Sequence, residues 1–270
     1  MSPRSPASTT APPSTPPTHV VRVPVTTLWV DPSSPRPVDA PIVADEPDAQ
    51  GWLAALDRAG VATRATDGRL GLHGLVESQL LAGEPVMVTA LDGGWARIVA
   101  PWQLSPKDQH GYPGWVPAAH LDPWPADAPH GVRPSASPAA TRAAAPVDDE
   151  HPAVVMARRH IGLPYLWCGI SPLGYDCSGL VLHLWRQLGH VVARDAYAQA
   201  ALAAPVALGT ERSGDLYFFA RSGRRIHHVG IVVNPGRMVH ASETGGTLVE
   251  EDLPAARLET LVAAGRLPGP

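Results

Sequence analysis

The chain has 270 residues, 44% of them apolar and 17% charged, with 25 acidic against 21 basic side chains. This composition is sufficient for a packed core, and the length favours two domains. The near balance of charge and the lack of any basic run argue against nucleic acid as a partner, and no apolar stretch approaches the ~18–20 residues of a membrane span.

The N-terminal segment is almost entirely Ser, Thr, Pro and Ala, which predicts a disordered tail over residues 1–19. It contains an early arginine but no apolar core, so it does not resemble a secretory signal peptide. Cys168 and Cys177 are the two cysteines of the chain, too few for a disulfide framework. These features predict a cytoplasmic protein with reduced thiols. A secreted protein is the alternative, if the start codon omits a signal.

Short strand-like segments occupy residues 20–124. Within 84–100, the segments EPVMVTAL and WARIVA flank the turn signal Asp92-Gly93-Gly94, which predicts a hairpin. The Gly/Pro-punctuated stretch 111–121 ends in another short strand, and DAQGWLAALDR at 48–58 predicts one inserted helix. Short strands with tight turns are typical of a small β-barrel, which we expect here.

A second Pro- and Ala-rich patch predicts a linker over residues 125–148, and the pattern changes after it. Residues 149–270 open with a segment that predicts a helix ending at Gly162. A second helix is predicted from Cys177 to Leu188, because apolar residues recur on one face before a terminal glycine. DLYFFA, HHVGIVV and RMVHAS then predict the strands of an antiparallel sheet, so this half is α+β.

Cys177 is predicted to lie in the first turn of its helix, because Asp176 is a favourable N-cap residue. The helix dipole and unpaired N–H groups at such a position lower a cysteine pKa, which suits a nucleophile. Ser178 and Gly179 are small and leave space for a substrate. The alternative is a buried structural cysteine.

His228 and His240 flank a predicted hairpin. If Asn234-Pro235-Gly236 is a three-residue loop, paired residue numbers sum to 470, and His240 lies opposite Gly230 with His228 as its diagonal neighbour. A loop of two or four residues would place the histidines on opposite faces. A cysteine, a histidine base and a third polar group form a nucleophilic site. A zinc site would use the same residue types, but no CxxC or HxxxH spacing is present.

The stretch PYLWCGISPLGYDCSGLV, followed by RDAYAQ, GDLYFF, HHVGIVV and MVHAS, resembles the NlpC/P60 family of cysteine peptidases over about residues 150–260. The resemblance implies a papain-like fold with Cys177 as nucleophile, His228 as base and His240 as the third member. VESQLLAGEPV, WARIVAP and PKDQHGYPGWVP resemble the SH3-like (SH3b) domain of γ-D-glutamyl-L-diamino acid endopeptidases. The chain is therefore expected to carry a small SH3-like β-barrel before its catalytic domain.

The same resemblance implies which residues contact the substrate. Those predicted from the catalytic half are Tyr165, Asp176, Ser178 and Asp195. Glu77 and Tyr112, from the SH3-like half, match a pair that meets the substrate's N-terminal ammonium, with Glu84 as the alternative acid. The sequence departs from the family pattern at Cys168, where relatives carry Gly or Ala, and at Ala196, where some carry a polar residue.

The expected activity is hydrolysis of the bond between γ-D-glutamate and a diamino acid, usually diaminopimelate, in peptidoglycan stem peptides with a free N-terminal L-Ala. Peptidoglycan-derived peptides are the expected partners, and no metal or organic cofactor is needed. The alternatives are a secreted hydrolase of intact peptidoglycan, a non-catalytic wall-binding protein, and an acyltransferase on a related fold. Cys168 is expected to be an unpaired, packed side chain.

Overall fold

The computed structural model of the chain describes residues 16–59, 67–128 and 150–268. Residues 1–15 of the predicted tail and 129–148 of the predicted linker lie outside the described residues. Thr18 and His19, which the sequence assigned to the tail, belong to the first sheet: the Thr18 N–H donates to the Val86 carbonyl at 3.0 Å, and His19 pairs with the same residue. The first sheet therefore extends into the segment that the sequence assigned to the tail.

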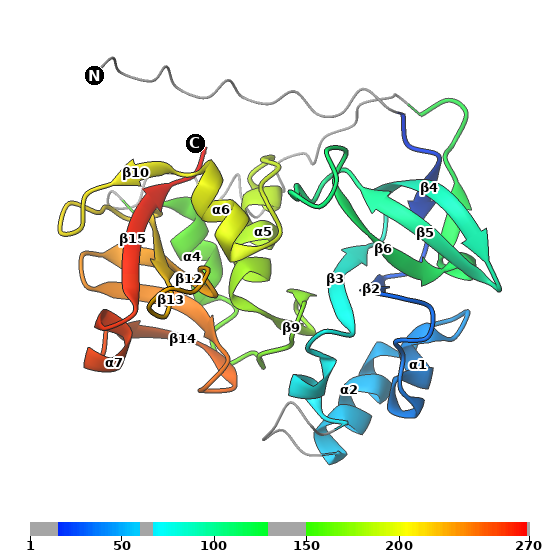
Figure 1. Cartoon of the computed structure of the whole chain (residues 1–270), viewed down its shortest axis with the longest axis horizontal. Helices are drawn as coiled ribbons and strands as arrows, with labels where there is room; N and C mark the ends of the chain where they lie inside the picture. The colour runs from blue at the N-terminus through cyan, green and yellow to red at the C-terminus, as the bar shows by residue number, and fades with distance from the viewer. Residues whose placement is uncertain (1–15, 60–66, 129–149, 269–270) are drawn as a thin grey trace.

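The first sheet has seven strands in the order β3-β2-β6-β5-β4-β1-β7, and its pairings are antiparallel (Figure 1). The strands are β1 (His19–Val21), β2 (Val25–Trp29), β3 (Val76–Leu81), β4 (Pro85–Asp92), β5 (Trp95–Ala100), β6 (Tyr112–Pro117) and β7 (Leu121–Pro123), with the 3₁₀ turn η3 (Ala118–His120) before β7. The predicted hairpin is confirmed, because Asp92 pairs with Trp95 and the two turn glycines have positive φ. Among the described residues no pairing joins β3 to β7, so the predicted barrel is not closed by hydrogen bonds.

A helical insert separates β2 from β3. Its elements are η1 (Pro37–Asp39), α1 (Ala40–Val43), α2 (Ala49–Arg58) and η2 (Arg69–Leu72). The predicted helix is α2, and Asp48 caps it by accepting a hydrogen bond from the Gly51 N–H at 2.8 Å. Trp52 of α2 is buried in one cluster with Leu166 and Cys168, so the insert shares a hydrophobic core with the second half of the chain.

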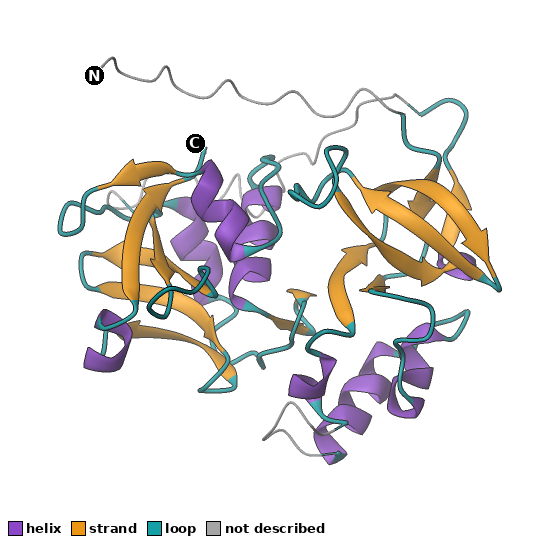
Figure 2. Cartoon of the chain, viewed as in Figure 1, coloured by secondary structure: helices purple, strands orange, loops and turns teal. Residues whose placement is uncertain are grey.

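The second half is built on a six-stranded sheet in the order β10-β15-β11-β12-β13-β14, again with antiparallel pairings. Its strands are β10 (Ala204–Val206), β11 (Leu216–Phe219), β12 (His228–Asn234), β13 (Arg237–Ser242), β14 (Thr247–Asp252) and β15 (Leu261–Arg266). The helices are α4 (Pro152–Arg158), α5 (Cys177–Gln187), α6 (Ala196–Leu202) and α7 (Ala255–Leu258), and β8 (Ile170–Ser171) pairs with β9 (Gly174–Tyr175). Helices α4 and α5 contact β12 and β13, and α6 contacts β11 and β12. Figure 2 shows these helices beside the sheet, with α5 nearest the first sheet. The mixed α and β content predicted for this half is confirmed.

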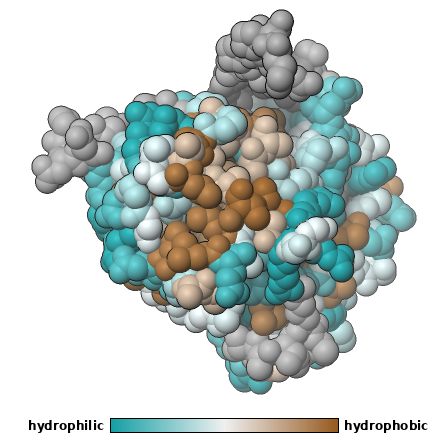
Figure 3. All heavy atoms as spheres, turned by 60° about the vertical axis from the view of Figure 1, so that its left-hand side comes forward, coloured by the Kyte–Doolittle hydropathy of each residue, from teal (hydrophilic) through white to brown (hydrophobic). Residues whose placement is uncertain are grey.

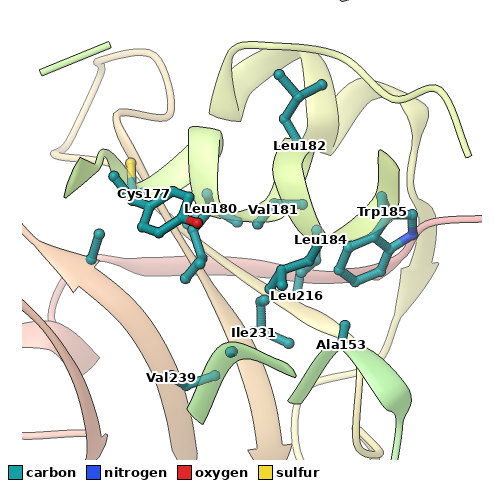
Figure 4. Packing of buried hydrophobic residues seen from close by; sticks show 14 of the residues in the cluster. Ala153, Cys177, Leu180, Val181, Leu182, Leu184, Trp185, Leu216, Ile231 and Val239 are labelled. Atoms are coloured by element: carbon teal, nitrogen blue, oxygen red, sulfur yellow. The ribbon is translucent and has the colours of Figure 1, made fainter. Parts of the chain in front are cut away.

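The apolar face of helix α5 packs against the C-terminal sheet. Figure 4 shows Leu184 and Val181 directed toward the sheet residues Ile231 and Val239, with Cys177 at the start of the same helix. Burying each such aliphatic side chain contributes about 1.5–3 kcal/mol to stability. The packing therefore fixes the position of the first turn of α5, where Cys177 lies.

The C-terminal sheet also presents apolar residues to the outside. Figure 3 turns that side of the molecule forward and shows apolar residues gathered on it. Exposed large apolar side chains in this half include Leu208, Leu258 and Val262. No helix among the described residues is long and apolar enough to cross a membrane.

Candidate active site

Cys177 is the first residue of α5, as predicted. The Asp176 side chain caps the helix by accepting a hydrogen bond from the Gly179 N–H at 2.6 Å. A side chain at position 179 is excluded, because an added Cβ would lie 2.0 Å from the carbonyl oxygen of Gly169. The sequence around Cys177 thus combines a cap with a residue small enough for close backbone approach.

The hairpin β12–β13 brings His228 and His240 together. Ile231 pairs with Val239, which is the register predicted from the sequence. The predicted three-residue loop is wrong, because Asn234 pairs with Arg237 and leaves a two-residue turn. A β-bulge between Val232 and Asn234 restores the parity, so both histidines remain on one face. His228 Nε2 lies 2.9 Å from His240 Nδ1.

Glu251 of β14 extends this line of side chains. Its Oε1 accepts from His240 Nε2 at 3.0 Å and from Arg257 Nε at 3.1 Å. Although burial opposes it, the hydrogen bonds from His240 and Arg257 hold the pKa of Glu251 below its usual value, so it is a carboxylate. Sequence reasoning missed Glu251 because no strand was predicted at 247–252. The available signal was the short β-prone stretch Thr247-Leu248-Val249, which follows the turn residues Gly245 and Gly246 after the His240 strand.

The ionised Glu251 determines the proton positions along the line. A carboxylate only accepts, so His240 carries its proton on Nε2 and accepts on Nδ1. His228 therefore donates from Nε2, which leaves its Nδ1 unprotonated. Burial lowers the pKa of His228 well below its usual value, and the neighbouring His240 acts in the same direction. His228 is thus a neutral imidazole with Nδ1 available to accept a proton.

The Cys177 sulfur lies against the first residues of β12. The backbone N–H of Val229, next to His228, is directed at this sulfur. Burial raises the pKa of Cys177 to about 12, and the adjacent Asp176 charge adds to the effect. The Val229 N–H, the Arg194 charge and the Ser178 N–H offset only part of it. The expectation of a lowered pKa is therefore wrong, because desolvation outweighs the helix dipole. At rest Cys177 is therefore a neutral thiol and His228 a neutral imidazole.

We expect the alkylation of Cys177 by iodoacetamide to follow this raised pKa. Only the thiolate reacts, so the rate should keep rising tenfold per pH unit through pH 9 instead of reaching a plateau near neutrality. Mass spectrometry after timed labelling separates Cys177 from Cys168, and glutathione serves as the reference thiol. A plateau below pH 8 for Cys177 would show instead that a thiolate is present at rest.

A cavity of about 310 Å³ opens beside Cys177. Seven of the residues predicted for the site line it: Glu77, Tyr112, Tyr165, Asp176, Cys177, Ser178 and Asp195. His228 lines an adjoining cavity that shares Tyr165 with this one. Residues from the two halves of the chain therefore meet around one thiol.

One end of this cavity is rich in oxygen atoms. Tyr112 Oη lies 3.1 Å from Glu77 Oε2 and 3.1 Å from Asp195 Oδ2. Burial raises the pKa of both Tyr112 and Asp195. The Lys107 ammonium contacts Glu77 and lies 4.7 Å from the centre of the Tyr112 ring. This end of the cavity already accepts one ammonium group, that of the protein itself.

Glu84, the alternative acid, is directed elsewhere. It is 1% exposed and forms a two-pronged ion pair with Arg186 of α5, at 2.8 and 3.0 Å. Of these two acids, Glu77 lines the cavity and Glu84 does not.

Asp176 is engaged by several protein donors. Besides capping α5, it accepts from the Cys168 N–H at 2.9 Å and from Arg194 Nη2 at 2.7 Å. Arg194 is 1% exposed and also donates to Ser78 Oγ of β3 at 2.8 Å and to Ser178 Oγ at 3.0 Å. Sequence reasoning passed over Arg194 in favour of its neighbour Asp195. An arginine directly before a predicted site residue was the available signal.

Both cysteines are free in this structure. Cys168 is buried, and its thiol donates to the Val76 carbonyl at 3.0 Å. Its φ of 63° lies in the left-handed region that favours glycine. Among the described residues there is no group of three or more His, Cys, Asp or Glu side chains that could hold a metal ion.

The chain is similar in sequence and fold to known proteins. The model of the NlpC/P60 family matches residues 162–261. The γ-D-glutamyl-L-lysine dipeptidyl-peptidase of Bacillus subtilis (strain 168) is 31% identical, over 85% of this chain and 92% of the relative. A protein of the same name from Bacillus cereus (strain ATCC 10987) is 24% identical, over 82% of each chain. The crystal structure of an NlpC/P60 family protein from Bacillus cereus ATCC 10987 covers 93% of this chain and 100% of its own, with a TM-score of 0.77 and 22% identity, which indicates a shared fold.

Proposed function

This chain belongs to the NlpC/P60 family, and from that premise we propose that it is a cysteine endopeptidase acting on peptidoglycan stem peptides. The bond cleaved joins γ-D-glutamate to a diamino acid, in peptides with a free N-terminal L-Ala, as part of cytoplasmic recycling of wall peptides. The proposal is supported by the hydrogen-bonded side chains of His228, His240 and Glu251, and by Cys177, which lies next to the strand of His228 and lines a cavity with an acidic end. The names of the two Bacillus relatives support the same substrate class.

In the proposed mechanism the Cys177 thiol gives its proton to His228 Nδ1 as the sulfur attacks the γ-carbonyl carbon of D-glutamate. Backbone N–H groups at the start of α5 hold the oxyanion. The His228 imidazolium, hydrogen-bonded through Nε2 to His240, then protonates the departing amine, and a thioester remains. Water that loses its proton to His228 hydrolyses the thioester and releases the glutamate carboxylate and the free thiol.

The acidic end of the cavity is the proposed site of the substrate ammonium. Glu77, Tyr112 and Asp195 provide anionic and phenolic oxygens, which are the partners that a desolvated ammonium needs. The Lys107 ammonium contacts Glu77 in the free protein, so the substrate would replace it there. Tyr165 and Ser178 are proposed to contact the L-Ala-γ-D-Glu portion. The first sheet, which begins at His19 and otherwise lies in the predicted segment 20–124, is proposed to be an SH3-like domain that completes the site of the catalytic domain at 149–270.

The decisive measurement compares L-Ala-γ-D-Glu-diaminopimelate with its N-acetylated form. Acetylation removes the ammonium, so the partly buried oxygen atoms of Glu77, Tyr112 and Asp195 lose the substrate cation, and we expect kcat/KM to fall by about 10²-fold or more. Product release is followed by chromatography and mass spectrometry. Glu77→Gln should reduce the discrimination between the two peptides.

Two other results would contradict the proposal in different ways. Equal cleavage of both peptides would show that the acidic end of the cavity does not recognise the substrate ammonium. Efficient release of peptides from intact sacculi that lack free L-Ala would favour a secreted wall hydrolase over a recycling enzyme.

A further inference from the structure

A second cavity, of about 840 Å³, adjoins the first on the side of His228. The two cavities share Tyr165, Arg225 and His227, so they form one continuous depression with Cys177 in one part and His228 in the other. In the mechanism above, the acylated part of the substrate lies in the first cavity. The residue that carries the leaving amine must then extend into the second.

The second cavity is strongly cationic, in contrast to the first. Five arginines and one carboxylate line it: Arg69, Arg221, Arg224, Arg225, Arg257 and Glu243. Burial lowers the pKa of His227, so the positive charge at neutral pH comes from the arginines. The charge of the lining is therefore opposite to that of the end where the substrate ammonium is proposed to bind.

Two of these arginines already have partners. Arg69 forms a two-pronged pair with Asp57, at 2.6 and 2.9 Å. Arg257 holds Glu251, as described above. These two are therefore engaged in maintaining the fold and the histidine line.

The other three arginines lie together on the loop between β11 and β12 and are exposed. The Arg225 guanidinium lies 4.2 Å from the centre of the Tyr197 ring, an arrangement that leaves it available to an anion. Within the described parts of the chain, no ion pair is found for Arg221, Arg224 or Arg225. Three cations without carboxylate partners at the edge of a substrate cavity are suited to an anionic ligand.

We infer that Arg221, Arg224 and Arg225 select a leaving diamino acid whose side chain ends in a carboxylate, so that diaminopimelate is preferred over lysine. This inference rests on the proposed function and specifies its substrate. A lysine side chain ends in an ammonium alone, which the arginines repel. The distal centre of diaminopimelate carries an ammonium and a carboxylate, and a guanidinium can bind the carboxylate through two N–H donors.

The test compares kcat/KM for L-Ala-γ-D-Glu-meso-diaminopimelate and L-Ala-γ-D-Glu-L-Lys. Both peptides end in a free α-carboxylate, so the ratio isolates the distal group of the side chain. We expect the native protein to prefer the diaminopimelate peptide by about tenfold or more, because each exposed ion pair contributes a modest factor and several act together. The preference should shrink in about 1 M salt, where exposed charges are screened.

The variant for this test is the double substitution Arg221→Gln with Arg224→Gln, for which the ratio should fall toward one. Arg225→Gln alone should lower it partly. Arg97→Gln, an exposed arginine of β5 that lines neither cavity, is the matched control and should keep the native ratio. Thermal unfolding followed by circular dichroism checks that each variant is folded.

Failure of this inference is distinguishable from failure of the proposed function. If the native protein cleaves both peptides at the γ-D-glutamyl bond with equal kcat/KM, or the double variant keeps the native preference, the arginines do not select the leaving group and the proposed function stands. If neither peptide is cleaved, both proposals are overturned.

Discussion

Replacing Cys177 by alanine is expected to abolish release of the diamino acid, with kcat lowered by about 10⁴–10⁶-fold, as for other enzymes that lose a nucleophile. The other thiol, Cys168, is not expected to substitute, because its sulfhydryl donates to the Val76 carbonyl. The change removes one sulfur atom at the surface of a cavity, so the fold and the substrate-binding residues should remain. Rapid-quench and steady-state measurements of released diaminopimelate provide the readout.

Cys168→Gly is the matched control for that experiment. Glycine adopts the positive φ of position 168 without strain, so this variant is expected to keep most of the activity. Isothermal titration of Cys177→Ala with the uncleaved peptide separates binding from turnover. Full activity in Cys177→Ala would contradict the assignment of Cys177 as the nucleophile. Binding of the peptide without turnover in the native protein would indicate a wall-binding protein.

The second large effect is expected at Arg194. Arg194→Met leaves the Asp176 carboxylate buried without its cation, and breaking such a pair typically costs about 3–5 kcal/mol of stability. Asp176 also caps α5, so a shift of this carboxylate displaces the first turn of the helix and Cys177 with it. We expect kcat to fall by about 10²-fold, the usual effect of a displacement near 1 Å at a catalytic centre.

Arg186→Met is the matched comparison, because Arg186 forms a buried ion pair with Glu84 and also joins α5 to the first half. It should lose comparable stability in urea unfolding but much less kcat, since it does not contact Asp176. Activity is measured at a temperature where both variants are folded. An equal loss of kcat in the two variants would mean that Arg194 acts only by holding the two halves together.

Local features of the site were predictable from the sequence. The cap at Asp176 and the first-turn position of Cys177 depend on neighbouring residues, and the structure bears them out. The pairing of Ile231 with Val239 was also predicted, but from a loop length that the structure contradicts, and it holds because a bulge compensates for the shorter turn. The resemblance to NlpC/P60 peptidases also named residues that line the cavity, although they come from both halves of the chain.

The parts that could not be predicted depend on contacts between distant segments. The role of Arg194 depends on its hydrogen bonds to Ser78 and Asp176, and these form only when the two halves of the chain pack together. The direction of the pKa shift at Cys177 depends on how completely the folded chain removes water, and a helix start alone does not report that. Glu251 could not be predicted because no strand was expected at 247–252, and the pairing of that strand with β13 brings Glu251 near His240.

The β-bulge between Val232 and Asn234 constrains how this hairpin can change in length. Side chains alternate along a strand, so inserting or removing one residue between His228 and His240 turns one ring to the opposite face of the sheet. Inserting or removing two residues preserves the alternation. The bulge and the two-residue turn therefore act as a matched pair, and loss of either one alone would separate the two imidazoles while leaving both histidines in the sequence.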